Sequence, residues 1–367
     1  MLDSSELLNF FIKNKIKFYS GVPDSIQKIF LEDLSLSKNI THIPAANEGS
    51  AVAISLGNYL SSKQIGLTYL QNSGLGNAIN PLISIAEKSV YSIPIILLIG
   101  WRGAPGTKDE PQHMAKGKIT KKILSNLKIK NILLNSNKDF KNISKLINYA
   151  KKNKTPVAIL VKNKTFKSKK TKKIINLKNS ILRSSFILNL LKLISVNDRI
   201  ISSTGYTSRE LYQLREVNEI KKGKDFYMVG GMGHSASLAL GCSANMRSKN
   251  IICLDGDGSM LMHMGSLATL AQYGKSNLKY ILLNNNTHES VGGQSTNVKN
   301  IDLDMFSKSL GFKKYFLINS KINIKKKINI FLKSKGPNFL EVKIKSQSIN
   351  KLGRPKNFKN IIRQFIK

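Results

Sequence analysis

The chain has 367 residues and a formal net charge of +38, from 59 basic and 21 acidic residues. This length predicts two domains of ordinary size. No signal peptide is visible and no apolar run reaches the ~18 residues that a membrane span requires, so we expect a cytoplasmic protein without a membrane anchor. Cys242 and Cys253 lie in apolar segments, which predicts buried thiols rather than a disulfide or a cysteine metal site.

The excess of positive charge is the feature that favours nucleic-acid binding. Lys-rich stretches such as residues 162–173 and 321–335 carry much of it, and no recognisable nucleic-acid module accompanies them. Lys, Asn and Ile are abundant throughout, which is typical of a compositional bias. We therefore expect no specific nucleic-acid partner and keep a basic nucleic-acid-binding protein as the alternative from another class. A positive field would in either case attract an anionic substrate.

Predicted strands and helices alternate through the first half. A helix at residues 4–14 precedes a strand at 17–20, after which Asp24 or Ser25 would cap the next helix. Further strands are expected at residues 41–44, 65–71 and 93–100, with a helix at 50–61 and another ending near Ala86. Such alternation predicts an α/β fold with doubly wound parallel sheets, in which ligands gather at the carboxyl ends of the strands.

Two places in the first half carry candidate chemistry. Glu48 lies at a strand end, directly before an apolar helix. Alone, it is also typical of a carboxylate that is stabilised by a helix start. The loop at residues 101–113 is long and rich in Gly, Pro and charge, which favours a functional loop. It contains Arg102 and Lys108 for anionic oxygens and His113 for proton transfer, and the other interpretation is a solvated surface loop.

A Lys-rich segment poor in core residues follows a strand at residues 156–161. We interpret it as a linker at residues 166–180 between two α/β domains, 1–165 and 181–367. The second half opens with a strand at residues 199–203, followed by Thr204 and Gly205. A strand at residues 227–229 then leads into a glycine-rich turn with Gly230 and Met232, and a helix at 235–246. Met232 between glycines is also compatible with ordinary packing.

The most informative stretch is a strand at residues 250–254 that runs into Gly256–Asp257–Gly258–Ser259. A helix is expected from Ser259 through Ala271, with His263 inside it, and a strand at 280–283 ends in Asn284–Asn285–Asn286–Thr287. The right-handed crossover brings both strand ends to one sheet edge, so Asp257 and Asn285 should meet. Their oxygens suit Mg²⁺ shared with a phosphorylated ligand, whereas the glycines alone could form a plain turn.

Twenty-five residues separate Gly258 from Asn284, and the whole resembles the diphosphate and Mg²⁺ motif of thiamine-diphosphate enzymes. The resemblance implies metal ligands at Asp257, Asn285 and the backbone carbonyl of Thr287. It implies cofactor contacts at Thr204, Gly205, Gly230, Met232, Gly256, Gly258 and Ser259. Glu48 would hydrogen-bond N1′ of the cofactor, a task that needs a carboxyl group shielded from water. The two domains would then bind the pyrimidine and the diphosphate, respectively.

Five further stretches resemble the narrower phosphonopyruvate decarboxylase family, whose close relative is sulfopyruvate decarboxylase. They are residues 21–25, 47–49, 100–113, 204–210 and 288–294, and Leu352–Gly353–Arg354–Pro355 adds to them. The resemblance implies conversion of 3-phosphonopyruvate to phosphonoacetaldehyde and CO₂, in phosphonate biosynthesis. His113, or a water that it holds, would donate a proton. The candidates for substrate binding are Arg102, Lys108, Gln112, His288 and Arg354.

The family implies a homodimer or a larger assembly with the active site between subunits. Sulfopyruvate, which would give sulfoacetaldehyde, is the nearest alternative substrate, because its sulfonate differs from a fully ionised phosphonate by one charge. A carboligase of the acetolactate type is less favoured, since the chain lacks the middle domain of such enzymes.

Overall fold

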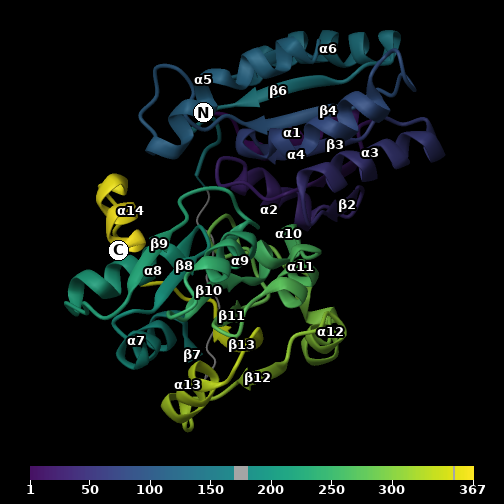
Figure 1. Ribbon diagram of the computed structural model, residues 1–367. Helices are drawn as coiled ribbons and strands as arrows, with labels where there is room; N and C mark the ends of the chain where they lie inside the picture. The colour runs from purple at the N-terminus through teal and green to yellow at the C-terminus, as the bar shows by residue number, and fades with distance from the viewer. Residues whose placement is uncertain (169–180, 350–351) are drawn as a thin grey trace. The chain divides into compact units, whose positions relative to one another are not determined.

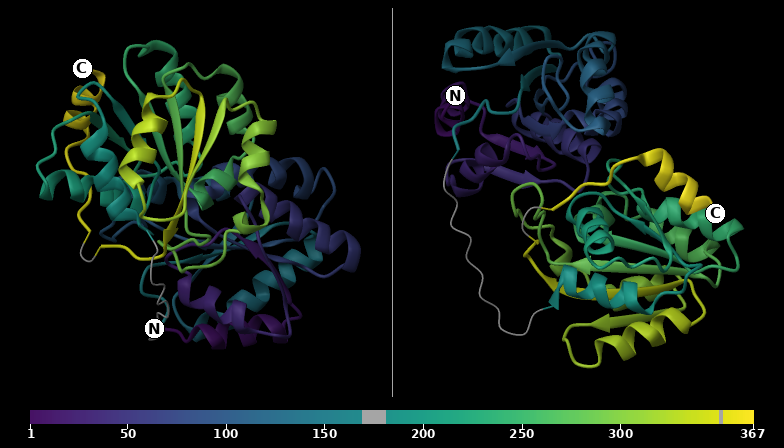
Figure 2. Two further views of the ribbon diagram at one scale, coloured as in Figure 1. Left: turned by 90° about the horizontal axis from the view of Figure 1, so that it is seen from below. Right: turned by 90° about the vertical axis from the view of Figure 1, so that its left-hand side faces the viewer.

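The computed structural model describes residues 1–168, 181–349 and 352–367. Contacts divide the chain into two compact units, Met1–Lys172 with Val291–Gln294, and Lys173–Ser290 with Ser295–Lys367. Each unit contains a parallel sheet with helices on both faces (Figures 1 and 2), which confirms the predicted fold class. Most of the predicted linker, residues 169–180, lies outside the described residues, so the linker stays a prediction. In the described part of the chain, no helix is long and apolar enough to cross a membrane.

The first unit is built on six parallel strands in the order β2-β1-β3-β4-β6-β5. The strands are β1 (Phe18–Gly21), β2 (Thr41–Pro44), β3 (Leu67–Gln71), β4 (Ile96–Gly100), β5 (Lys130–Leu134) and β6 (Val157–Val161). The helices are α1 (Ser4–Lys13), α2 (Lys28–Leu36), α3 (Glu48–Ser62), η1 (Asn72–Gly74), α4 (Leu75–Pro81), η2 (Leu82–Ala86), α5 (Pro111–Asn126), η3 (Asn137–Asp139) and α6 (Phe140–Asn153).

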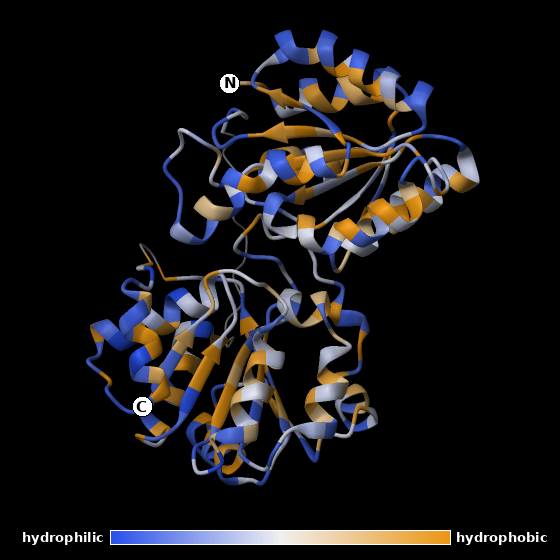
Figure 3. Cartoon of the chain, turned by 45° about the horizontal axis from the view of Figure 1, so that its top comes forward, coloured by the Kyte–Doolittle hydropathy of each residue, from blue (hydrophilic) through white to orange (hydrophobic). Residues whose placement is uncertain are grey.

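Burial on both faces explains why the central strands of this unit are almost entirely apolar. Every residue of β4 and β6 is buried. Helices α1, α2 and α6 cover one face of the sheet, and α3, α4 and α5 cover the other. The hydropathy colouring shows the same layering, with hydrophobic strands at the centre and hydrophilic outer helix faces (Figure 3).

The second unit has a parallel sheet in the order β12-β13-β11-β10-β8-β9, with the short β7 added beside β13. The strands are β7 (Ile181–Leu182), β8 (Arg199–Ser202), β9 (Lys224–Tyr227), β10 (Ile251–Gly256), β11 (Leu278–Asn284), β12 (Lys314–Ile318) and β13 (Asn338–Lys345). The helices are α7 (Arg183–Leu193), α8 (Tyr206–Val217), α9 (Ser235–Asn245), α10 (Asp257–Met262), α11 (Ser266–Tyr273), η4 (Val298–Asn300), α12 (Leu303–Ser309), α13 (Ile324–Lys333) and α14 (Phe358–Ile366).

Two apolar clusters fill the two faces of this second sheet. Helices α7, α8 and α13 pack on one face, and α9, α11 and α12 pack on the other. The C-terminal helix α14 packs against β9, the last strand in the sheet order. There the ring of Phe365 meets Phe226 edge-on, and its carbonyl oxygen accepts a hydrogen bond from Nε of Arg199 at 2.7 Å. The helix thereby covers an edge strand.

Four local predictions were wrong. The single helix expected after Gly258 is two helices, because the chain leaves helical geometry at His263 (φ −135°, ψ 49°), so His263 is not a residue of a helix interior. The strand expected at residues 227–229 is β9, which ends at Tyr227. Helix α5 begins at Pro111, so the last part of the predicted loop is helical. Neither Asp24 nor Ser25 caps α2, whose N-cap position is Gln27.

Candidate active site

A pocket in the second unit lies where β8, β10 and β11 end. Its cavity volume is small, about 80 Å³. The residues predicted from the sequence that line it are Thr204, Met232, Gly256, Asp257, Gly258, Ser259, Asn285, Thr287 and His288. Parallel strands bring their carboxyl ends to one edge of the sheet, which is why residues so far apart in the sequence meet here.

Gly205 and Gly230 are not among the described residues that line this pocket. Gly205 nevertheless adjoins it at the start of α8, with a φ of 87° that favours glycine. A Cβ at that position would lie 3.3 Å from Oγ of Ser290, which does line the pocket. Gly230 lies in the turn between β9 and α9, two residues before Met232.

Asp257 supplies a buried carboxylate at the first position of α10. Its side chain accepts hydrogen bonds from the hydroxyl of Thr296 at 2.8 Å and from the backbone N–H of Gly258 at 3.0 Å. Burial raises the pKa of Asp257 to about 6, against the lowering effect of these hydrogen bonds. A bound divalent cation would supply the positive charge that favours the ionised form of this carboxyl group.

The other candidate metal ligands are neutral oxygen atoms. Oδ1 of Asn285 accepts a hydrogen bond from the backbone N–H of Thr287 at 3.1 Å and has a second lone pair available. Within the described residues, no group of three His, Cys, Asp or Glu side chains could hold a metal. One carboxylate with amide and carbonyl oxygens is the donor set that suits Mg²⁺ shared with phosphate. The residues present therefore fit the metal that the sequence implies.

Met232, Gly258 and His288 pack together at the pocket wall. A Cβ on Gly258 would come within 2.6 Å of the His288 ring and 3.4 Å of the Met232 methyl group, so only glycine lets both side chains approach. Burial lowers the pKa of His288 to about 4, which leaves its imidazole neutral at physiological pH. The backbone N–H of Gly233 donates to Oγ of Ser259 at 3.1 Å, which ties the glycine-rich turn to α10.

In the first unit, Glu48 is the first residue of α3 and is 5% exposed. The N-cap residue Asn47 accepts a hydrogen bond from the backbone N–H of Ser50 at 2.9 Å. Nδ2 of Asn77 donates to Oε2 of Glu48 at 2.8 Å. Glu48 is therefore shielded from water, as its predicted role requires, and one of its oxygens is already oriented by an amide.

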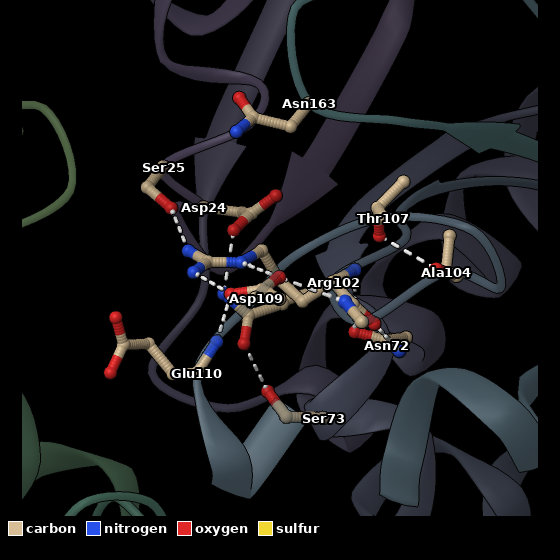
Figure 4. A network of polar contacts seen from close by, with 12 residues as sticks. Asp24, Ser25, Asn72, Ser73, Arg102, Ala104, Thr107, Asp109, Glu110 and Asn163 are labelled. Atoms are coloured by element: carbon tan, nitrogen blue, oxygen red, sulfur yellow. Dashed lines mark hydrogen bonds and ion pairs between the residues drawn. The ribbon is translucent and has the colours of Figure 1, made fainter. Parts of the chain in front are cut away.

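Arg102 lies in a dense polar network shown in Figure 4. Its guanidinium donates to both oxygens of Asp109, at 2.7 and 2.5 Å, and to the hydroxyl of Ser25 at 3.1 Å. Burial alone raises the pKa of Asp109, but hydrogen bonds from Arg102 and two backbone N–H groups hold it well below its usual range. The sequence had suggested an Arg for substrate anions, and the structure shows one whose charge is already paired and whose position is fixed.

Asp24 lies beside Arg102 and is fully buried. Its Oδ1 accepts from Nε2 of Gln71 at 2.7 Å, whereas its Oδ2 accepts no hydrogen bond from the described residues. Burial raises the pKa of Asp24, and Gln71 and Arg102 lower it by smaller amounts. The sequence analysis interpreted Asp24 as a candidate helix cap and as part of a stretch that resembles the family, and it assigned no chemical role to this carboxylate.

The other predicted substrate residues are spread over both units. Lys108 is exposed on the loop before α5, and Gln112 and His113 lie half-buried in the first turn of that helix. The backbone N–H of His113 donates to the carbonyl of Glu110 at 2.8 Å. Arg354 is exposed in the second unit and is not among the described residues that line the pocket.

Comparison with known proteins covers both units. Residues 5–124 match "Thiamine pyrophosphate enzyme, N-terminal TPP binding domain", and residues 203–342 match "Thiamine pyrophosphate enzyme, C-terminal TPP binding domain". The chain is 30% identical over 354 residues to the phosphonopyruvate decarboxylase of Streptomyces viridochromogenes, covering 92% of this chain and 87% of that protein. The chain belongs to the phosphonopyruvate decarboxylase family of thiamine-diphosphate enzymes.

Two further relatives are similar to most of the chain. The phosphonopyruvate decarboxylase of Streptomyces hygroscopicus is 29% identical over 373 residues, covering 97% of this chain and 91% of that protein. The sulfopyruvate decarboxylase of Methanosarcina acetivorans is 27% identical over 339 residues, covering 86% and 84%. Because both cofactor-binding domains match, thiamine diphosphate is the cofactor of this member of the phosphonopyruvate decarboxylase family.

Other residues that line the pocket were not predicted from the sequence. Arg183, Ser203, Tyr206, Thr207, Leu283, Glu289 and Ser290 complete its lining. Arg183 precedes the second matched domain, and the local sequence around it indicates only the start of a helix. Glu289 belongs to a stretch that resembles the family, yet nothing in that stretch indicates which group it contacts. Only the fold brings these two side chains together.

Proposed function

We propose that the protein decarboxylates 3-phosphonopyruvate to phosphonoacetaldehyde and CO₂, with thiamine diphosphate and Mg²⁺. The observation that carries the proposal is the pocket of the second unit, which gathers the predicted metal and diphosphate residues at one sheet edge. The substrate is inferred from the similarity to two phosphonopyruvate decarboxylases, which extends over most of the chain. The pocket thus supports the cofactor, and the similarity supports the reaction and its substrate.

Asp257, the Asn285 side-chain oxygen and the Thr287 backbone carbonyl would hold Mg²⁺. The diphosphate would lie against Thr204, Gly205, Gly256, Gly258 and Ser259. The glycines would allow the backbone to approach it closely. Met232 would support the cofactor from the pocket wall, and the Gly230 carbonyl would accept from its amino group.

Bound thiamine diphosphate supplies the electron sink for the electron pair that remains when CO₂ departs. Glu48 would hold the proton at N1′ of the cofactor's pyrimidine. The burial of Glu48 and the hydrogen bond from the Asn77 amide support this role, because the carboxyl group exchanges a proton in surroundings that exclude water.

The substrate is a carboxylate with a second anionic group, and cationic donors are needed where water is excluded. We assign this binding to Arg102, Lys108 and Arg354, with Gln112 and His288 as neutral donors. Asp109 would hold the Arg102 fork ready for a phosphonate oxygen. During the reaction a proton replaces the carboxylate on the keto carbon, and His113, or a water that it holds, would donate that proton.

We propose further that the active enzyme is at least a homodimer and that each site takes Glu48 from one subunit and Asp257 from the other. The chain is also similar to an alpha subunit and to a beta subunit of sulfopyruvate decarboxylases, over 31% and 32% of its length, respectively. Two separable partners that build one function are compatible with such a site.

The test is release of CO₂ from 3-phosphonopyruvate, sulfopyruvate and pyruvate, with and without thiamine diphosphate and Mg²⁺. We expect turnover of phosphonopyruvate that depends on both, and a loss of at least ~10² in Glu48→Gln, because proton exchange by the buried carboxyl group is removed. Glu32→Gln is the matched control, since Glu32 lies on α2 and pairs only loosely with Lys28 at 3.8 Å. Its rate should equal that of the wild type.

Absence of cofactor-dependent release from all three acids would refute the decarboxylase assignment. Preference for sulfopyruvate would keep the mechanism and change the substrate. That second candidate has its own support in the similarity to the Methanosarcina acetivorans enzyme, and a ratio of kcat/KM values for the two acids decides between them.

A further inference from the structure

A neighbouring carboxylate fixes the orientation of the Asn285 side chain. Nδ2 of Asn285 donates to Oε2 of Glu289 at 3.1 Å, while its Oδ1 accepts from the backbone N–H of Thr287 at 3.1 Å. An ionised carboxylate can only accept hydrogen bonds. Glu289 therefore selects the amide nitrogen, because a reversed amide would place two oxygens against each other. The amide oxygen, the atom that a metal ion needs, is left on the opposite side.

Glu289 is in turn held by Arg183, the first residue of α7, which is 4% exposed. One arm of the guanidinium pairs with Oε2 of Glu289, and Nη1 pairs with Oε1 of Glu210 at 3.2 Å. Glu210 is fully buried, and the same oxygen accepts from the backbone N–H of Ile349 at 3.2 Å. A planar fork with a carboxylate on each arm leaves little freedom of rotation.

We propose that Glu289, fixed by Arg183, is a positioning residue that presents the side-chain oxygen of Asn285 to the magnesium ion. The inference rests on the proposed function, in which Asn285 is a ligand. The same atom, Oε2 of Glu289, accepts from both Arg183 and Asn285. Any displacement of this oxygen therefore frees the amide of Asn285 directly.

A carboxylate near a metal could also act through its negative charge. Here Arg183 pairs with Glu289 and also with Glu210, so its single charge is shared between two carboxylates. The orientation of the Asn285 amide depends instead on a hydrogen-bond acceptor at a fixed place. This distinction leads to different expectations for Ala and Gln at position 289.

The experiment is a calorimetric titration of the apoprotein with Mg²⁺ at saturating thiamine diphosphate. We expect Glu289→Ala to weaken Mg²⁺ binding by ~10–100-fold, the usual effect of losing a partner of a metal ligand. Glu289→Gln should stay within a few-fold of the wild type, because its amide oxygen can accept from both Arg183 and Asn285. Where the Ala variant loses its cooperative unfolding, Glu289→Leu removes the acceptor while keeping the bulk.

The matched control is Asp225→Asn, which breaks another buried ion pair of the same unit. Asp225 pairs with Arg215 through two contacts of 2.7 Å, and neither residue lines the pocket. This variant should lower Tm and leave Mg²⁺ affinity unchanged. Unchanged affinity in Glu289→Ala, or equal losses in the Ala and Gln variants, would overturn the inference alone. Failure of the wild type to bind thiamine diphosphate with Mg²⁺ would instead overturn the proposed function and this inference with it.

Discussion

Glu48 is confined by its neighbours on more than one side. Asn77 holds one of its oxygens, and Gly74 faces the rest of its side chain. A Cβ built on Gly74 would lie 2.1 Å from Oε1 and 2.4 Å from Cγ of Glu48, closer than real atoms approach. The position of the carboxyl group thus depends on the absence of a single methyl group in η1.

We therefore predict that Gly74→Ala lowers kcat by roughly 10², because displacement of a catalytic group by ~1 Å costs about that much. Gly76→Ala is the matched control, since a Cβ there meets no atom within 4 Å and the glycine lies in the following helix α4. Steady-state kinetics and Tm of both variants make the comparison. Full activity in Gly74→Ala would show that Glu48 has room to move without consequence.

At the scale of single residues, the sequence predicts well what depends on local geometry. Gly256, Asp257 and Gly258 come at the end of a buried strand. The local pattern alone therefore predicts a tight turn with a carboxylate at the edge of the sheet. Arg183 and Glu289 are 106 positions apart, and their pairing depends on how α7 packs beside the pocket. Local sequence contains no record of that packing, so these two residues could be found only in the fold.

Among the elements, β11 is a central strand in which every residue is buried. Lys279 interrupts its apolar run. Its side chain is 1% exposed, and its Nζ donates to the carbonyl of Ser334. Burial lowers the pKa of Lys279 from 10.5 to about 8.

This shift predicts a pH dependence of stability. Below pH 8 the amine is charged in the folded and the unfolded chain, so the folded state bears the full cost of a buried charge. Between about pH 8 and 10.5 the unfolded chain keeps a proton that the folded chain has released, so the free energy of unfolding rises with pH. Urea unfolding should show the wild type gaining stability relative to Lys279→Met across this window. A constant difference between the two proteins would contradict the assignment.

The observed helix boundaries differ from the predicted ones in several places. The helix expected at residues 50–61 is α3, which begins at Glu48 because Asn47 supplies the cap. The break at His263 escaped prediction, since Leu267, Leu270 and Ala271 beyond it have the spacing of a helix face. The ring of His263 instead packs against that of His234, at 4.5 Å between centroids. A tertiary contact at that place is beyond the reach of periodicity.

On the scale of the whole molecule, the proposal of a shared site makes a test by complementation possible. Glu48→Gln and Asp257→Asn should each be inactive alone. In a mixed dimer, one site would receive both wild-type residues, so co-expression of the two variants should restore about a quarter of the wild-type activity by random pairing. A site built within one chain would give no recovery, because every chain carries one defect. Activity per subunit of the purified mixture decides the matter.

Two α/β units were predictable for the whole molecule because strands and helices alternate with turn residues between them, from Phe18 to Val161 and again from Arg199 onward. The strand orders were not, since the same alternation is compatible with several arrangements of parallel strands. The sequence also does not indicate which element α14 packs against, although the apolar spacing of α14 is typical of a helix with one buried face.

The position of α14 has a practical consequence for handling the protein. A bare edge strand offers unpaired backbone groups to neighbouring molecules and invites aggregation. In this protein Phe365 fixes α14 over β9. Removal of α14, or a polar residue at position 365, would disturb that cover. Poor solubility of such a variant would report an uncovered strand.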